Sequence, residues 1–394
     1  MRYSFLPSVL ATSLAFHIAL ADLVERDVER SGTASGTGSS ALLPYIPSSC
    51  TVSTYSSLSA AVSSCTALSL SSLTVPANTT LDLTNLKDGA TVVFEGTTSF
   101  IFSSDMTADM IKVTGKGVTL AGAKGHVIDG NGGAWWDGQG GNGGVVKPGH
   151  FITLSNLTDN SVVRDLNIKN WPTHCFYITN SSDLTISNIN LDNSAGDAPN
   201  SASGCKPAGH NTDGFGISSS TNVLLTNSTV RNQDDCVAVT SGSGITVQNM
   251  DCRGGHGLSI GSVGGKANND VSNVVFRNSK IANSANGVRI KTNSGTTGTV
   301  SNITYSGITL SGITIYGIDI QQDYLNSGPT GIPTNGVKIN GVTIKDVTGT
   351  VCGGKNYYIL CGYGSCSNFD FEGVSVTGGS GDSCNFRPAG GFTC

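Results

Sequence analysis

Short stretches that alternate apolar and polar residues recur along the chain from Phe176 onward. In one repeat, Val237-Ala-Val-Thr is followed by Ile245-Thr-Val, and similar pairs of phrases stand before and after it. Equivalent apolar positions lie 21 to 39 residues apart, at Phe176, Phe215, Val237, Leu258, Val288 and Ile318. Alternation with a period of two predicts half-buried strands. Because one repeat cannot bury its own apolar face, the repeats must stack on one another.

The sequence therefore predicts an all-β fold, a right-handed, single-stranded parallel β-helix that forms a solenoid of about ten coils. We expect Ile, Val and Leu inside the coils, Thr, Ser and Asn outside, and Asn and Gly at the corners. A sandwich or barrel is the alternative, but its short hairpin turns do not suit spacings this long and regular. A short helix between Cys50 and Cys65, around Leu58 to Leu68, is expected to cap the N-terminal end of the stack.

The N-terminal segment has the features of an exported precursor. Residues 1–21 are interpreted as a signal peptide, because a basic residue precedes an apolar run that ends in a small-residue cleavage site. Residues 22–30 suit a propeptide, with a retained arm as the alternative, and residues 31–48 suit a Ser/Gly-rich linker. No later segment is long enough to cross a bilayer. We expect a secreted, extracellular protein with residues 49–394 as its β-helix catalytic domain.

Eleven cysteines in an exported chain favour disulfides, because an oxidising compartment makes the bridge the stable form. Four pairs would each close a short loop: Cys50 with Cys65, Cys236 with Cys252, Cys361 with Cys366, and Cys384 with Cys394. Cys175 and Cys205 form a further candidate pair, which leaves Cys352 unassigned. Five Asn-x-Ser/Thr sequons suit a glycosylated surface, at Asn78, Asn156, Asn180, Asn227 and Asn302.

The composition limits the partners of the protein. Only 12% of the residues are charged, and glycine fills 52 positions, which is typical of a chain rich in β structure and turns. The net charge of −5 includes no basic footprint for nucleic acid. An anionic ligand would have to be held by a few local cations against an unfavourable overall field.

Titratable residues occur at the same position of three consecutive repeats. Asp213, Asp235 and His256 each stand two residues before the first strand residue of consecutive repeats. Equivalent positions of adjacent coils lie side by side, so these three side chains are expected to form one column, with Asp234 joining them from the same turn. Adjacent residues of a strand face opposite ways, so Asp234 and Asp235 can both reach a cleft only if that segment bends.

Two cations follow in the next repeat. Arg289 and Lys291 have the same parity in a strand and project from the same side. Three carboxylates, one imidazole and two cations on one face suit the acid/base hydrolysis of an acidic sugar polymer.

Four segments carry a resemblance to a known family. They are Asn211-Thr-Asp213-Gly, Gln233-Asp-Asp235-Cys, Gly254-Gly-His256-Gly-Leu-Ser-Ile-Gly and Arg289-Ile-Lys291. In this order they resemble the signature segments of the polygalacturonases, glycoside hydrolase family 28. Gln321-Gln-Asp-Tyr324 and the β coils match as well, so the resemblance covers roughly Cys50 to Cys394.

The resemblance implies an endo-acting hydrolase of the α-1,4 bonds of polygalacturonate that inverts the anomeric centre. It makes Asp234 the general acid, Asp213 and Asp235 the activators of water, and His256 the partner that maintains the protonation of the acid. Among clustered carboxylates one pKa is pushed upward, which supplies a proton donor. No metal or other cofactor is expected, and the protein is expected to act as a monomer, with a plant inhibitor protein as a candidate partner.

The resemblance also suggests residues that bind substrate. Arg289 and Lys291 would hold substrate carboxylates, Arg289 through a bidentate fork and Lys291 as a point charge. Tyr324 would contact a sugar beside the cleavage point. Asn211 stands close enough to Asp213 in the sequence to line the site as well. The chain departs from the family at Gly216, where many members carry an acidic residue, and this puts the hydrogen bonding beneath Asp213 in doubt.

Structural roles are the alternative for each residue. Asp213 and Asp235 suit turns in which a carboxylate bonds its own backbone. His256 suits a tight corner between glycines. Exposed strand cations such as Arg289 and Lys291 often serve only solubility. Packing is the alternative for Tyr324, and ordering of a loop is the alternative for Asn211.

Other functions suit the same scaffold. An exo-polygalacturonase or a rhamnogalacturonan hydrolase would cleave by similar chemistry. A pectate lyase would abstract a proton with an arginine and hold its substrate through calcium, but no calcium cluster is recognisable in the sequence. A carbohydrate-binding β-helix would use the acidic column only to order its turns.

Overall fold

The computed structural model describes residues 43–326, 328–391 and 393–394. The predicted signal peptide (1–21), the predicted propeptide (22–30) and residues 31–42 of the predicted linker lie outside these ranges. The start of the catalytic domain at residue 49 stays a prediction.

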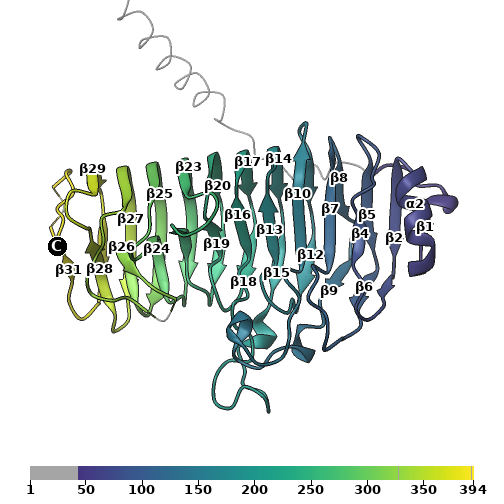
Figure 1. Cartoon of the computed structure of the whole chain (residues 1–394), viewed down its shortest axis with the longest axis horizontal. Helices are drawn as coiled ribbons and strands as arrows, with labels where there is room; N and C mark the ends of the chain where they lie inside the picture. The colour runs from purple at the N-terminus through teal and green to yellow at the C-terminus, as the bar shows by residue number, and fades with distance from the viewer. Residues whose placement is uncertain (1–42, 327, 392) are drawn as a thin grey trace, which may run out of the picture. The chain divides into compact units, whose positions relative to one another are not determined.

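The described residues form a solenoid of parallel strands whose coils follow one another along its length (Figure 1). An 11-stranded sheet receives one strand from each coil: β4 (Leu81–Leu83), β7 (Ile111–Lys116), β10 (Ile152–Thr158), β13 (Phe176–Thr179), β16 (Phe215–Ser218), β19 (Val237–Val239), β22 (Leu258–Val263), β24 (Asn286–Asn293), β26 (Tyr316–Tyr324), β28 (Lys355–Leu360) and β31 (Ser383–Cys384). This sheet forms one face of every coil. The predicted parallel β-helix is confirmed.

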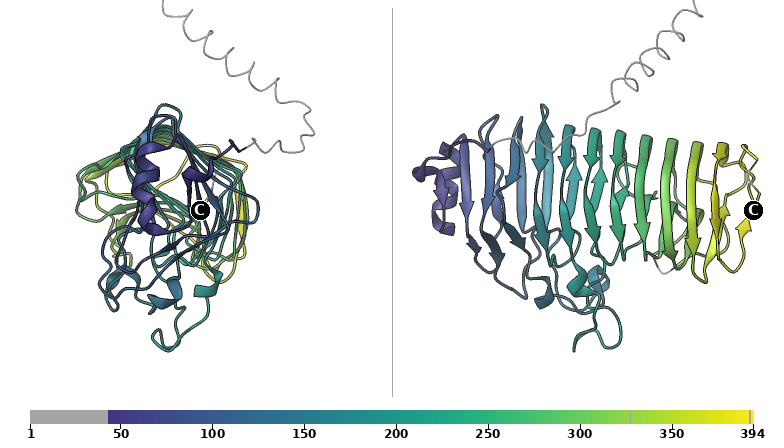
Figure 2. Two further views of the ribbon diagram at one scale, coloured as in Figure 1. Left: turned by 90° about the vertical axis from the view of Figure 1, so that its right-hand side faces the viewer. Right: turned by 180° about the vertical axis from the view of Figure 1, so that it is seen from behind.

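A 20-stranded sheet forms the remaining faces of the coils. Its strands are β1 (Thr51–Val52), β2 (Ala67–Ser71), β3 (Thr74–Val75), β5 (Thr91–Glu95), β6 (Thr97–Phe100), β8 (Thr119–Gly122), β9 (Val127–Asp129), β11 (Val162–Arg164), β12 (Asn167–Lys169), β14 (Ser182–Ser187), β15 (Asn190–Asp192), β17 (Ser220–Thr226), β18 (Thr229–Arg231), β20 (Gly242–Gln248), β21 (Asp251–Arg253), β23 (Asp270–Ala282), β25 (Gly298–Ile313), β27 (Val337–Val351), β29 (Cys366–Glu372) and β30 (Ser375–Thr377). Figure 2 shows the strands of successive coils side by side from behind.

Strand register confirms the repeat that was read from the apolar pattern. The predicted equivalent positions pair directly from coil to coil, in the order Phe176, Phe215, Val237, Leu258, Val288 and Ile318. These side chains are fully buried in the solenoid, where the rings of Phe176 and Phe215 stack at 5.1 Å. Each such burial stabilises the fold by roughly 1.5–3 kcal/mol.

Asparagines order the corners, as expected. Asn188, Asn227 and Asn249 all adopt the left-handed conformation, with φ near 55°, which asparagine tolerates better than most residues. The side chain of Asn249 donates to Oδ1 of Asn227 in the preceding coil at 3.0 Å. The five sequon asparagines are all exposed residues with positive φ. Their glycosylation stays a prediction.

Short helices mark one end of the solenoid and its loops. They are η1 (Ser48–Cys50), η2 (Tyr55–Ser57), α2 (Leu58–Ser64), η3 (Gly132–Ala134), η4 (Gly140–Asn142) and η5 (Ser194–Gly196). Helix α2 lies at the N-terminal end of the coils, where the cap was expected, and buries Leu58, Ala61 and Val62 (Figure 1). Within the described ranges no helix has the length and apolarity needed to span a membrane.

All four predicted short-loop disulfides are present. The suggested pairing of Cys175 with Cys205 is wrong, because Cys175 points into the hydrophobic core while Cys205 is exposed in a loop. Cys352 is an exposed free thiol.

Candidate active site

Asp213, Asp235 and His256 lie next to one another at the N-terminal ends of three consecutive strands of the 11-stranded sheet. Each stands two residues before the first paired residue of β16, β19 or β22, and these first residues are in register. The predicted column is therefore confirmed. The Asp235 side chain is only 3% exposed, whereas the His256 side chain is 34% exposed toward solvent.

The chain bends at Gln233 and Asp234, which allows two adjacent carboxylates to line one cleft. The side-chain amide of Asn232 holds the bend, because it donates to the backbone oxygens of Asp234 (2.9 Å) and Asp235 (3.0 Å). The next coil passes very close to this bend. A Cβ at Gly255 would lie 2.2 Å from the backbone oxygen of Asp234, so only glycine fits there.

Asp234 is held through both carboxylate oxygens. Its Oδ1 lies 3.0 Å from Nδ1 of His256 and accepts a hydrogen bond from the backbone N–H of Asp235 at 2.7 Å. Its Oδ2 accepts from Nδ2 of Asn211 at 3.0 Å. These contacts fix the orientation of the carboxyl group that was predicted to be the general acid.

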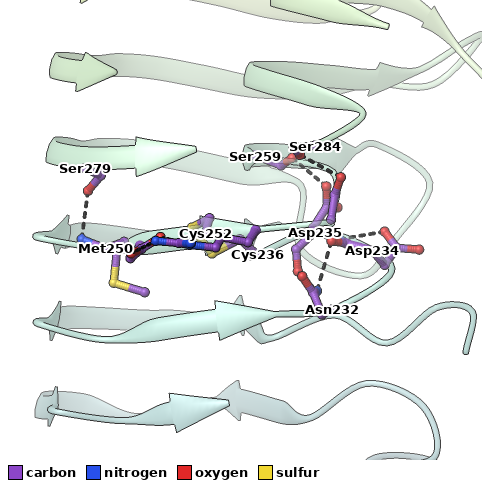
Figure 3. The surroundings of a disulfide bond; sticks show 12 residues. Asn232, Asp234, Asp235, Cys236, Met250, Cys252, Ser259, Ser279 and Ser284 are labelled. Carbon is purple, nitrogen blue, oxygen red and sulfur yellow. Dashed lines mark hydrogen bonds and ion pairs between the residues drawn. A yellow bond between two sulfur atoms is a disulfide. The ribbon is translucent and has the colours of Figure 1, made fainter. Parts of the chain in front are cut away.

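Asp235 is held by different partners. Lys291 Nζ donates to Oδ2 and Ser259 Oγ donates to Oδ1, both at 2.7 Å. The Cys236–Cys252 disulfide follows directly, and Figure 3 shows Asp235 between this bridge and Ser259. The bridge crosses the interior of the coil that carries Asp235, from the residue after Asp235 to β21, the last strand before the chain enters the coil of His256.

The two predicted cations are largely buried and already have partners inside the protein. Arg289 donates from Nε to Asp319 Oδ2 at 3.0 Å and lies 4.0 Å from Asp235 Oδ1. The ring of Tyr324 covers both cations, with its centroid 5.4 Å from Arg289 Cζ and 5.2 Å from Lys291 Nζ. Sequence reasoning missed Asp319, although it occupies the position equivalent to Arg289 in the next repeat.

Asparagine side chains connect the loops beside the site. Asn142 in η4 donates to Asn211 Oδ1 at 3.3 Å and accepts from Asn326 Nδ2 at 3.1 Å. Asn142 precedes β10, whereas Asn326 follows β26, so the two residues come from opposite ends of the strands. Asn142 therefore bridges the two walls of the cleft, and Asn211 both orders a loop and contacts Asp234.

The clustered charges raise the pKa of one carboxyl and lower that of another, as expected, but the raised pKa was expected at Asp234. Burial raises the pKa of Asp213 well above its ordinary value, and the neighbouring charges of Asp234 and Asp235 raise it further. Burial alone would also raise the pKa of Asp234, but the His256 imidazole and Lys291 hold that pKa far below its usual range. The carboxyl whose pKa is raised is thus Asp213, whereas the pKa of the predicted acid, Asp234, is lowered.

The pKa of His256 is raised as well. Burial alone would lower the pKa of His256, but the charge and hydrogen bond of Asp234, with the charge of Asp235, raise it. The contact of His256 Nδ1 with Asp234 Oδ1 at 3.0 Å therefore favours the protonated imidazole. The role predicted for His256, as the residue that maintains the protonation of the acid, stays a prediction with a matching geometry.

The column extends beyond the residues that sequence reasoning singled out. His174 and His150 stand two residues before the first paired residues of β13 and β10. His174 Nε2 lies 3.6 Å from Asp213 Oδ1. His150 stacks on Tyr177 at 4.3 Å and contacts Asp109 Oδ1 through Nδ1 at 3.1 Å. Applying the same offset from each strand would have found both histidines.

One cleft, with a volume of about 590 Å³, unites most of these groups. Its lining includes all three predicted catalytic aspartates, Asn211, Lys291, Tyr324, both newly found histidines and one further cation, Lys266. His256 lies at an adjoining hollow of about 550 Å³ with Asn142 and Gln233.

A metal ion was not expected, and this stays a prediction. Asp234, Asp235 and His256 place three potential ligand atoms within 4.8 Å of one another. However, Asp234 already binds His256, and Asp235 already binds Lys291. A positively charged Lys291 at this spot opposes the binding of a second cation.

Comparisons with known proteins agree with the geometry. The model of glycosyl hydrolases family 28 matches residues 65–391. A probable endopolygalacturonase D of Neosartorya fischeri is 58% identical over 337 residues, which cover 86% of this chain and 71% of that protein. A polygalacturonase of Fusarium fujikuroi is 56% identical over 340 residues, which cover 86% of this chain and 91% of that protein.

A solved structure is similar over most of the chain. Endopolygalacturonase I from Stereum purpureum, solved in complex with two galacturonate, is 33% identical. It superposes with a TM-score of 0.76, over 86% of this chain and 98% of that one.

Proposed function

The chain belongs to glycosyl hydrolases family 28, and from this premise we propose that it cleaves α-1,4-galacturonosyl bonds inside polygalacturonate, with inversion. It is a glycoside hydrolase. The relative from Neosartorya fischeri and the solved structure from Stereum purpureum are both named as endopolygalacturonases. One observation carries the detailed proposal: Asp213, Asp234 and Asp235 line a single cleft beside Lys291, with His256 bonded to Asp234.

In the proposed reaction, Asp234 protonates the glycosidic oxygen. The proton comes from the Asp234–His256 hydrogen bond, since transfer from Nδ1 to Oδ1 converts an imidazolium and a carboxylate into a neutral imidazole and a carboxylic acid. As the bond to the leaving sugar breaks, water attacks the anomeric carbon from the opposite face. Asp213 and Asp235 orient that water and accept its proton, which requires Asp213, whose pKa is raised in the free cleft, to be in its carboxylate form.

The two buried cations support this chemistry in different ways. Lys291 keeps the Asp235 carboxylate in place, and its charge stabilises negative charge at that position. Arg289 uses Nε for Asp319, which leaves its terminal amino groups for a substrate carboxylate. The Tyr324 ring, which lies over both cations, is proposed to contact the sugar beside the cleavage point.

The cellular setting is proposed on the same basis. Four disulfides suit an oxidising compartment, so we propose that the protein is secreted and acts outside the cell. We further propose that it acts as a monomer on pectin and that a plant inhibitor protein is a candidate partner. Secretion of the full chain with loss of residues 1–21 from the mature protein would support this setting.

A time course of product sizes on polygalacturonate tests the function. Random internal cleavage produces a broad range of oligomers early, whereas an exo-acting enzyme releases one small product from the start. Asp234→Asn should lower kcat at least about 100-fold, the low end for general acid catalysis. Asp251→Asn, which changes an aspartate of the other sheet, is the matched control and should retain activity. Equal activity in both variants would contradict the proposal.

The alternative chemistries give different signals. A lyase leaves an unsaturated sugar that absorbs ultraviolet light, and its calcium makes it sensitive to a chelator. A rhamnogalacturonan hydrolase would leave polygalacturonate intact. A non-catalytic binding protein would release no reducing ends in any of these assays.

A further inference from the structure

Lys266 stands on a loop that is fixed against the cleft. The loop follows β22 and turns back toward earlier coils, where Asn268 Nδ2 donates to Ser219 Oγ at 3.2 Å. Asn269 Oδ1 accepts from the backbone N–H groups of Gly264 (3.1 Å) and Lys266 (2.9 Å). Ser219 directly follows β16, the strand that Asp213 precedes. The loop therefore carries Lys266 back toward the coil of Asp213.

Lys266 differs from the other cleft cations in its partners. Its Nζ donates to the backbone oxygen of Ser262 at 3.0 Å, and it makes no ion pair with any residue between 43 and 394 that the structure describes. Lys291 and Arg289, by contrast, are each bound to a buried carboxylate. Lys266 thus has no carboxylate in ion-pair contact among the described residues.

The opposite wall carries the histidines. In a parallel sheet, residues that precede the strands lie at the N-terminal ends of the strands, and residues that follow the strands lie at the C-terminal ends. His174 precedes β13, and its side chain is 40% exposed. Lys266 follows β22, so His174 and Lys266 line the cleft from opposite ends of the strands.

The floor between the two walls is open. Gly216 lies on this floor, and a Cβ built there would meet no atom closer than 3.4 Å. Tyr177, the neighbour of Gly216 in the preceding coil, supplies an aromatic ring beside this space. A small floor next to an aromatic ring suits a pyranose, whose apolar C–H face packs on aromatic side chains.

We propose that Lys266 and His174 bracket a subsite that binds the carboxylate of one galacturonate unit beside Asp213, away from the unit that Arg289 contacts. The inference rests on the proposed function, because a chain of galacturonate has a carboxylate on every sugar. Each carboxylate that enters this acidic protein needs its own positive partner. Lys266 is the cation of the described cleft lining that has no carboxylate bound to it.

Kinetics of Lys266→Gln test the subsite. Loss of one charge-assisted contact should raise KM for polygalacturonate about tenfold and leave kcat within about twofold. On fully methyl-esterified pectin, which has no carboxylates to bind, the variant should match the wild type. The matched control is Lys338→Gln, because Lys338 is also an exposed lysine whose ammonium contacts a backbone oxygen, but it lies on the other sheet.

His174→Gln and the double variant complete the test. If both side chains hold one carboxylate, each single change raises KM, and the double change raises it by less than the product of the two. An unchanged KM in Lys266→Gln, or an equal rise in Lys338→Gln, would overturn the subsite. Neither result would affect the proposed function, which fails only if the wild-type protein leaves polygalacturonate uncut.

Discussion

The Cys236–Cys252 disulfide offers a sharp test of how the solenoid positions its chemistry. Cys236 directly follows Asp235, and Cys252 stands four residues before His256 in the next coil. Replacing both cysteines with alanine removes the covalent link between the residue that follows Asp235 and the strand that leads to His256. Both side chains are buried, so alanine avoids placing a new polar group in the core.

The chain provides a control of nearly equal size. The Cys236–Cys252 bridge spans 16 residues and the Cys50–Cys65 bridge spans 15. The loop-closure estimate for either loop is about 3 kcal/mol of stability, because the two loop lengths hardly differ. The Cys50–Cys65 bridge, however, belongs to the N-terminal cap, which contributes no residue to the cleft.

We expect both double variants to unfold at similarly lower urea concentrations. Only the Cys236→Ala/Cys252→Ala variant should also lose kcat, by about 10- to 100-fold, because a displacement of about 1 Å at a catalytic group has this cost. Initial rates on polygalacturonate at 25 °C, in buffer in which both variants are folded by circular dichroism, measure the difference. A wild-type kcat in this variant would refute the positioning role, and very unequal unfolding midpoints would refute the loop-length reasoning.

Other predictions follow from the charges of the cleft. Because the pKa of His256 is raised, the His256–Asp234 ion pair stabilises the fold fully below about pH 6.5. This stabilisation is lost as the pH rises through the pKa of His256 in the folded protein. The melting temperature of the wild type should therefore fall over that pH range more than the melting temperature of His256→Gln. The pKa of Asp213 is also raised, so kcat should rise with pH through a value well above the usual range of an aspartate and then decline as His256 loses its proton. Lys291→Met should lower kcat at least about 100-fold, because the buried charge on Asp235 loses its partner. A circular dichroism spectrum like that of the wild type would show that the loss of activity is not caused by unfolding. Tyr324→Leu removes the ring over both cations and should raise KM for polygalacturonate by severalfold, whereas an unchanged KM would favour a packing role.

Much of the site could be predicted from the sequence, because in a solenoid residues at equivalent positions of successive repeats become neighbours in space. Asp213, Asp235 and His256 share an offset from the first residue of their strands, and strand register turns that offset into a column. His150 and His174 share the same offset, so they were equally accessible to this reasoning. Both histidines lie outside the four segments that resemble the family.

Lys266 could not be found in this way. Its loop follows β22, and only the contact of Asn268 with Ser219 shows that the loop turns back toward the coil of Asp213. An irregular loop has no periodicity, so its sequence does not predict which coil it faces. The pairing of Cys175 with Cys205 failed for a similar reason, since the course of a long loop decides whether two thiols meet.

The fold, the column of acids and the four short disulfides follow from the spacing of residues along the chain, because each depends on regular spacing within or between neighbouring coils. Which carboxyl has the raised pKa depends on the three-dimensional packing of the cleft. Asp213 and Asp234 are the same residue type in the same column, but His256 bonds to Asp234, while Asp213 faces two other carboxylates. Protonation depends on distances of a few ångströms between charges in a buried cleft, and such distances are set by the packing of whole coils.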